Sequence, residues 1–190
     1  MPRQVIITKE VIDKTAFNLV RSKGMESLTA RNIAQQVGCS TQPIYKIYQN
    51  LDKLKENAVL MAQQYINSMI SNYNKTPIPF LNAGLGFINF AATEKVLFRT
   101  FVAENYLQSP IFDPLESKEL YLKMGELLND APLNNTELSE LFLDTMIYTN
   151  GLAHLAYSGQ LGMSEKQLAE KLIGFFFRQA NLKWDGELEL

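Results

Sequence analysis

The stretch of sequence that decides the fold is LTARNIAQQVGCSTQPIYKIY, residues 28–48. Thr29 is placed to cap a helix that carries apolar residues at helical spacing and ends at Gly38. Ser40 is expected to cap a second helix over residues 41–48, with Pro43 in its first turn, where a missing N–H costs nothing. Two short helices joined by a glycine-containing turn are typical of a helix-turn-helix.

The residues before this stretch predict one more helix, over residues 8–23. Thr8 is placed to cap it and Gly24 to end it. Its apolar residues recur at helical spacing between charged ones and are Val11, Ile12, Ala16, Leu19 and Val20. A three-helix domain over residues 1–49 follows from the two stretches together.

The second helix of a helix-turn-helix enters the major groove, and its first side chains meet base edges. Thr41 and Gln42 stand there, and glutamine can pair bidentately with adenine. Tyr45, Lys46 and Tyr48 follow about one turn later, where hydroxyl and ammonium groups meet phosphates.

A different interpretation is that the apolar and aromatic residues of this helix only pack the small core. We prefer packing for Ile44 and a phosphate contact for Tyr45. The full set of residues expected to contact DNA is Arg3, Thr29, Arg31, Ser40, Thr41, Gln42, Tyr45, Lys46, Tyr48 and Lys53.

Charge is distributed unevenly along the 190 residues. Residues 1–55 hold nine Lys and Arg against four Asp and Glu, a net charge of +5, whereas residues 56–190 carry −7. A basic N-terminal segment on an acidic remainder indicates that only the former meets a polyanion. An uneven split by chance is the other interpretation, and charge alone does not decide between them.

The motif at residues 28–48 resembles the N-terminal domain of TetR-type (TetR/AcrR) transcriptional regulators. The resemblance lies in Leu28-Thr29-x-Arg31-x-Ile33-Ala34-x-x-Val37-Gly38-x-Ser40, followed by Ile44-Tyr45-x-x-Tyr48. It implies nine or ten helices, dimerisation through the last two long helices, and a ligand chamber in the C-terminal part. The sequence departs from the family pattern in three places: Ile47-Tyr48 replaces the usual His-Phe, Leu51 replaces a lysine, and Pro43 stands where a small residue is common.

The chain beyond residue 49 predicts further helices. Asn50 is placed to cap a long one through residue 72, and helical patterns follow at 80–92, 95–107, 116–129, 137–158 and 165–181 between breaks rich in proline, asparagine and glycine. No stretch alternates long enough to predict a strand. The expected fold is all-α with about nine helices, with residues 50–190 forming a ligand-binding and dimerisation domain.

Aromatic and methionine side chains in this second domain would favour a flat or apolar ligand. Ordinary core packing is the more common role for any single one of them. The residues expected to bind ligand are Phe87, Phe101, Asn105, Phe142, Thr145, Met146, Asn150 and His154.

A four-helix dimer interface is expected from the last two helical patterns. Gly151, in mid-helix, is unfavourable there unless it allows close approach of another backbone. The predicted interface residues are Gly151, Ala156, Leu168, Leu172, Phe175 and Phe176. Burial of these residues within one monomer is the other interpretation.

These features favour a homodimeric repressor that binds a palindromic operator in double-stranded DNA and is released by a small apolar or aromatic effector. The alternative is a helical carrier of small molecules or lipids without a DNA partner. An enzyme is not expected, because the single histidine leaves no catalytic pairing or metal-ligand cluster, and no cofactor or metal is expected. With one cysteine, no signal segment and no bilayer-spanning stretch, we expect a cytoplasmic protein with no membrane partner.

Overall fold

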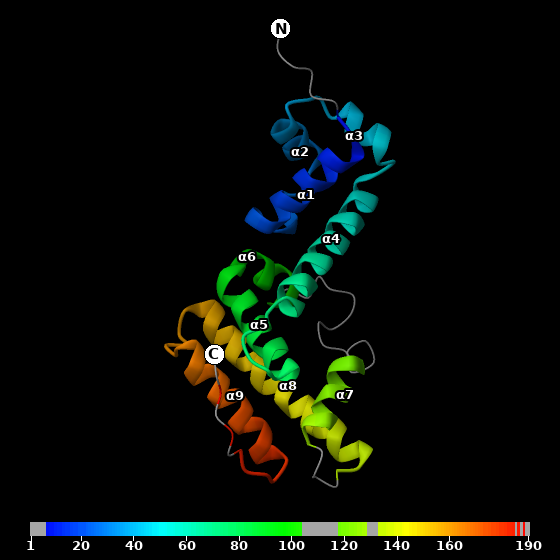
Figure 1. The fold of residues 1–190 in the computed structure, drawn as a ribbon. Helices are drawn as coiled ribbons and strands as arrows, with labels where there is room; N and C mark the ends of the chain where they lie inside the picture. The colour runs from blue at the N-terminus through cyan, green and yellow to red at the C-terminus, as the bar shows by residue number, and fades with distance from the viewer. Residues whose placement is uncertain (1–6, 104–117, 129–132, 185, 187, 189–190) are drawn as a thin grey trace. The chain divides into compact units, whose positions relative to one another are not determined.

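The computed structural model describes residues 7–103, 118–128, 133–184, 186 and 188, and within these ranges the chain forms helices and no strand (Figure 1). The all-α prediction is therefore confirmed, with nine α-helices in the described part of the chain. The helices group into two compact units. Of the described residues, 7–66 and 94–103 belong to the first unit, and 67–93 with those from 118 onward belong to the second. The predicted division at residue 49 concerns function and stays a prediction.

The first unit holds the helices around the helix-turn-helix. They are α1 (Lys9–Lys23), a 3-10 turn (Met25–Ser27), α2 (Ala30–Val37), α3 (Gln42–Ile47), α4 (Leu51–Ser71) up to residue 66, α6 (Lys95–Phe98) and a π-turn (Arg99–Ala103). Its core consists of apolar side chains that are almost wholly buried, among them Ile12, Ala16, Val20, Ile33, Ile44, Leu54 and Ala58.

Side-chain caps fix where most of these helices begin. The Thr8 hydroxyl accepts a hydrogen bond from the Val11 amide at 3.3 Å, and the Thr29 hydroxyl accepts one from the Asn32 amide at 3.1 Å. Asn50 caps α4 in the same way, through the Lys53 amide at 2.9 Å. These three predicted caps are confirmed.

The turn between α2 and α3 begins at the predicted residue, but the helix after it is not capped as predicted. Gly38 ends α2 in the left-handed conformation, with φ at +77°, as predicted. Ser40 does not cap α3: Thr41 occupies the N-cap position in helical conformation and makes no side-chain capping bond. A cap requires an extended N-cap residue, and the tight turn through Cys39 leaves Thr41 already helical.

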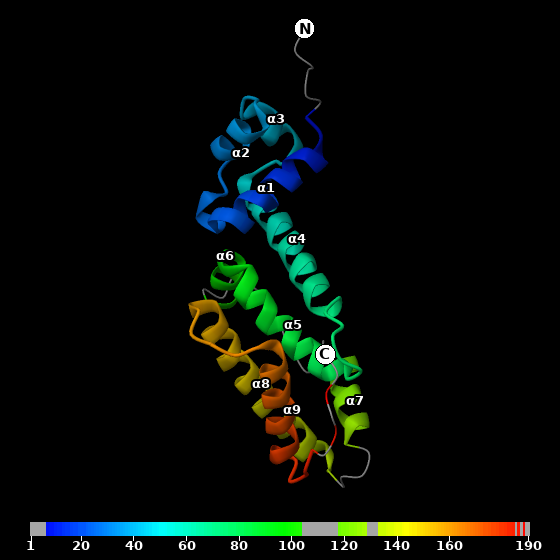
Figure 2. The ribbon, with the colours of Figure 1, turned by 60° about the vertical axis from the view of Figure 1, so that its left-hand side comes forward.

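The second unit is built from α5 (Pro79–Thr93), α7 (Lys118–Leu127), α8 (Asn135–Ser158) and α9 (Glu165–Gln179). Figures 1 and 2 both show α5 lying along α8, with α9 beside them. Because α5 is apolar on nearly every face, it is buried on nearly every side. At Gly86 a Cβ atom would lie 2.9 Å from the Ile70 carbonyl oxygen, so only glycine allows this close approach to the end of α4.

Two of the later helices start at capping boxes. Asn134 and Glu137 exchange hydrogen bonds with each other's backbone at the start of α8, and Ser164 and Gln167 do so at the start of α9. One predicted helix is wrong in part. The helix expected over 95–107 is interrupted after residue 98 by the π-turn, which keeps Thr100 and Phe101 buried, and residues 104–107 lie outside the described part.

Candidate nucleic-acid interface and effector pocket

The helix α3 presents its polar side chains to solvent, because a single apolar residue on its inner face packs into the core. Ile44 is 1% exposed and belongs to the core of the first unit. Thr41, Gln42 and Lys46 are exposed, and Tyr45 is 52% exposed. Four of the five side chains that residues 41–48 were expected to offer for base and phosphate contacts are thus accessible, and the preferred packing role of Ile44 is confirmed.

Tyr48 lies differently from Tyr45. It is only 6% exposed, and its hydroxyl donates a hydrogen bond to the Asp13 carboxylate of α1. Lys9 pairs with the same carboxylate at 2.7 Å, and its Nζ lies 5.2 Å from the centre of the Tyr48 ring. Burial, together with the bond to Asp13, raises the pKa of Tyr48, and the bond to Asp13 raises the pKa of Lys9.

The phosphate contact expected of Tyr48 is therefore corrected to a packing role, in which Tyr48 ties the end of α3 to α1. The signal for this lay in the sequence resemblance, since Tyr48 stands where the family usually has an apolar phenylalanine.

The remaining predicted DNA contacts lie on several parts of the first unit. Arg31, Ser40 and Lys53 are exposed, and Lys53 Nζ donates to Gln49 Oε1 at 3.3 Å. Thr29 is half-buried and its hydroxyl caps α2. Arg3 lies outside the described residues.

A charged cluster that sequence reasoning missed joins three helical segments of the first unit. Arg21 Nε lies 3.1 and 3.0 Å from the two carboxylate oxygens of Glu94, the residue before α6, and the Tyr65 hydroxyl of α4 donates to Glu94 Oε1 at 2.8 Å. The Arg21 guanidinium also lies 4.8 Å from the centre of the Tyr65 ring.

Burial alone would raise the pKa of Glu94. Hydrogen bonds from Arg21 and Tyr65 outweigh it, so the pKa is lowered. Because Arg21 and Glu94 are 73 residues apart, no local pattern indicated this pair.

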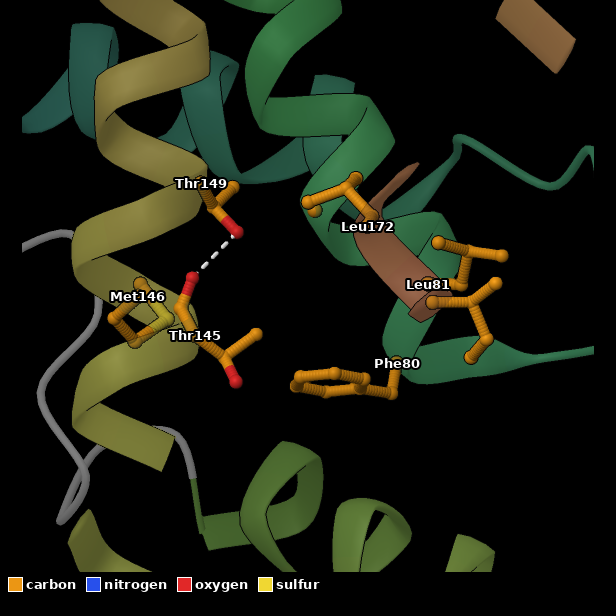
Figure 3. Close-up of a pocket in the computed structure, with 8 residues that line it drawn as sticks. Phe80, Leu81, Thr145, Met146, Thr149 and Leu172 are labelled. Atoms are coloured by element: carbon orange, nitrogen blue, oxygen red, sulfur yellow. Dashed lines mark hydrogen bonds between the residues drawn. The ribbon is translucent and has the colours of Figure 1, made fainter. Parts of the chain in front are cut away.

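A small pocket lies in the second unit between α5, α8 and α9 (Figure 3). Its volume is about 20 Å³, enough for one water molecule. The lining residues are apolar except for two threonines and are Phe80, Leu81, Gly84, Thr145, Met146, Thr149, Leu172 and Ile173.

The ligand residues expected from sequence are brought together only in part. Thr145 and Met146 line the pocket. Phe87 and Phe142 are buried in the second unit but do not line the pocket, and Phe101 belongs to the first unit.

Asn150 and His154 are exposed, with His154 Nδ1 3.0 Å from the Asn150 carbonyl oxygen, and Asn105 lies outside the described residues. The six lining residues that were missed carry no motif, because core and pocket residues have the same spacing along a helix.

The outer face of α8 carries an apolar row. Leu143, Ile147 and Leu155 are 57%, 62% and 40% exposed, and they follow one another at intervals of four and eight residues. Gly151 completes the row, and a Cβ built there would meet no atom of the described residues within 4 Å. We call these four residues the α8 row.

The predicted dimer residues divide between this surface and the core. Gly151 is exposed, and Phe175 is half-buried and stacks on Tyr148, with ring centres 4.0 Å apart. The other four are buried within one chain, as the alternative interpretation held: Ala156, Leu168, Leu172 and Phe176. The helical spacing in the sequence does not tell which faces of α8 and α9 pack within one chain, and the predicted interface stays a prediction.

Other kinds of site were also sought among the described residues. In these ranges no group of three His, Cys, Asp or Glu side chains is placed to hold a metal ion. No helix in the described part combines the length and apolar character that a membrane span requires.

The fold resembles those of solved bacterial regulators. A TetR-like transcriptional regulator from Rhodococcus sp. RHA1 aligns with a TM-score of 0.63 and 11% identity, covering 92% of this chain and 96% of that one. A second Rhodococcus sp. protein, assigned to the TetR family of transcriptional regulators, aligns with a TM-score of 0.57 and 14% identity, covering 90% and 97%. No family model matches the sequence, and no curated protein matches it significantly. The chain thus has the fold of TetR-like transcriptional regulators.

Proposed function

We propose that this chain is a TetR-type transcriptional repressor that binds a palindromic operator as a homodimer and is released by a small apolar or aromatic effector. The observation that carries the proposal is the exposed polar row of α3, held by buried Ile44 on a segment with a net charge of +5. Gln42 and Thr41 would meet base edges, and Tyr45 and Lys46 would meet phosphates. Such a role places the protein in the cytoplasm, with the chromosome.

The proposed dimer uses the α8 row. Three large apolar side chains on one exposed face favour burial against a partner, and the open space at Gly151 lets a second helix approach closely. Phe175 of α9 and its stacking partner Tyr148 extend this face. Two copies would then present two α3 helices to successive major grooves, about 34–36 Å apart.

The proposed effector site is the pocket between α5, α8 and α9. An effector acts only through its preference for one of two states of the dimer, typically about 1–3 kcal/mol. The state favoured by the effector would space the two α3 helices so that they no longer match adjacent grooves.

The dimer is tested by changing one exposed apolar residue at a time. Ile147→Asp should yield monomers in sedimentation velocity and lower the affinity for duplex DNA. Leu122→Asp is the matched control, because Leu122 is 54% exposed on α7 and lies outside the α8 row. Monomers from both variants, or dimers from both, would refute the proposed interface.

DNA binding is tested by selecting, from a random pool, the duplexes that the wild-type chain retains, and by following its affinity for them as the salt concentration changes. Binding should weaken steeply as salt rises, because phosphate contacts release counterions. Ligand binding to the second unit without any retained DNA would favour the carrier alternative.

A further inference from the structure

The pocket between α5, α8 and α9 has walls that select for a particular ligand chemistry. We propose that it binds an uncharged small molecule that carries one hydrogen-bond donor on an apolar, flat body, as a simple phenol does. This inference names the ligand class of the proposed effector site, and so its regulatory meaning rests on the proposed function. Binding itself does not depend on DNA.

The walls disfavour a charged ligand. Among the eight described residues that line the pocket, none carries a charge, and Thr145 and Thr149 are the only polar side chains. Both are 3% exposed. A carboxylate or ammonium group in such surroundings would lose its hydration without gaining a counter-charge.

The two threonines can accept hydrogen bonds but have no donor to offer. The Thr145 hydroxyl donates to the Leu141 carbonyl at 2.8 Å, and the Thr149 hydroxyl donates to the Thr145 carbonyl at 2.7 Å. Each hydroxyl has one hydrogen and two lone pairs, so its hydrogen is committed to the helix backbone while acceptor capacity remains. A ligand O–H or N–H satisfies this capacity, whereas a ligand with acceptors only does not.

The pocket also favours a flat apolar body. Figure 3 shows the Phe80 ring pointing toward Thr145 across the pocket. Phe80 is held from behind by Phe176, with ring centres 5.0 Å apart. Met146, half-buried, also lines the pocket, and since its side chain is flexible we expect it to shift and enlarge the cavity of about 20 Å³ when one ring binds.

Gly84 lines the pocket, and its lack of a side chain leaves space there for a ligand. A Cβ atom at this position would lie 3.5 Å from Leu172 Cδ1 and 3.7 Å from Thr149 Cγ2, which are ordinary contact distances. Gly84→Ala therefore fits the fold and removes a helical glycine, so it should raise the Tm of the free protein. The same methyl group occupies part of the pocket, so ligand affinity should fall.

The first experiment measures binding of three probes to the full chain by isothermal titration calorimetry: p-cresol, p-xylene and p-toluate. Thr145→Val together with Thr149→Val keeps the shape but removes both acceptors. We expect this double variant to bind p-cresol about two- to tenfold more weakly, the effect of one hydrogen bond, and to bind p-xylene within about twofold of wild type. p-Toluate should not bind at ten times the concentration that saturates with p-cresol.

Equal changes for p-cresol and p-xylene, or binding of p-toluate as tight as that of p-cresol, would overturn the proposed ligand class. Retained p-xylene binding in the double variant shows that the pocket is intact.

The second experiment compares Gly84→Ala with Gly125→Ala, a helical glycine of α7 whose Cβ would lie 3.6 Å from Leu138 Cδ2, an ordinary contact distance. Both substitutions should raise the Tm, but only Gly84→Ala should weaken p-cresol and p-xylene, by about tenfold or more. Unchanged affinity in Gly84→Ala would place the ligand elsewhere.

The two proposals fail in different ways. If p-cresol binds as expected but never releases DNA, the regulatory function fails and the ligand class stands. If a charged compound releases DNA while p-cresol does not bind, the ligand class fails and the regulatory function stands.

Discussion

The surface of α3 and the pocket of the second unit are two proposed binding sites that helices build in different ways. On α3 the side chains proposed for DNA contact are exposed, and one buried residue, Ile44, holds the helix. In the pocket, the residues that would touch a ligand are mostly buried and also form the core between α5, α8 and α9. We therefore expect recognition and stability to be separable on α3 and coupled in the pocket, and the following predictions test that contrast.

The largest effect is expected beneath α3. Ile44→Ala removes a side chain that is 1% exposed and should lower the free energy of unfolding by about 2–5 kcal/mol, through lost burial and the cavity left behind. Urea denaturation of the full chain measures this. A loss below about 0.5 kcal/mol would mean that α3 is held by something other than Ile44.

Gln42→Ala should leave stability unchanged and affect DNA recognition. Because Gln42 is exposed, the free energy of unfolding should stay within about 0.5 kcal/mol of wild type. Discrimination at one base position of the operator should fall by about 1–3 kcal/mol. Affinities for a set of single-base operator variants measure it.

The matched change at Tyr45 separates base contacts from phosphate contacts. Tyr45→Phe should weaken binding to every duplex alike, since a phosphate contact carries no sequence information. Equal, sequence-independent losses from the Gln42 and Tyr45 variants would refute base reading by Gln42.

Tyr48→Phe tests whether Tyr48 belongs to the core rather than to the DNA surface. Removing the hydroxyl that bonds Asp13 should cost about 1 kcal/mol of unfolding free energy. The salt dependence of DNA binding should not change, because no phosphate contact is lost. A shallower salt dependence with unchanged stability would restore the phosphate contact first expected of Tyr48.

The smallest effect concerns Glu94 and depends on pH. The pKa of Glu94 is lowered from its ordinary value of 4.5, so its contribution to stability is complete above that value and is lost as pH falls through the lowered folded-state pKa. Glu94→Gln should cost at most about 1 kcal/mol near neutral pH, because the Arg21 partner is partly exposed.

The difference in unfolding free energy between wild type and Glu94→Gln should shrink as the pH falls below 4.5. A difference that grows on acidification would contradict the lowered pKa.

The same contrast explains what could be predicted from sequence. The helix-turn-helix depends on caps, a glycine turn and helical spacing within about twenty residues, so the caps Thr29 and Gly38 and the anchor Ile44 were predictable. The cap at Ser40 failed because the tight turn makes Thr41 helical, which is a detail of backbone geometry.

The pocket brings residues of α5 together with residues of α8 and α9 that lie more than fifty positions further along the chain, and its residues follow the same periodicity as the core. Thr145 and Met146 were expected at a ligand site because of their chemistry and do line the pocket, whereas Phe80, Gly84 and Thr149 became visible only when three helices were placed together. The face of α8 that stays exposed was likewise decided by what α5 and α9 cover.

Selection of bound duplexes from a random DNA pool by the wild-type chain tests sequence-specific recognition by α3 most directly. The expected result is a single enriched palindrome whose half-sites lie about one helical turn or somewhat more apart, bound by two chains. Recovery of duplexes without any common sequence, at the affinity of nonspecific binding, would contradict recognition through Thr41 and Gln42.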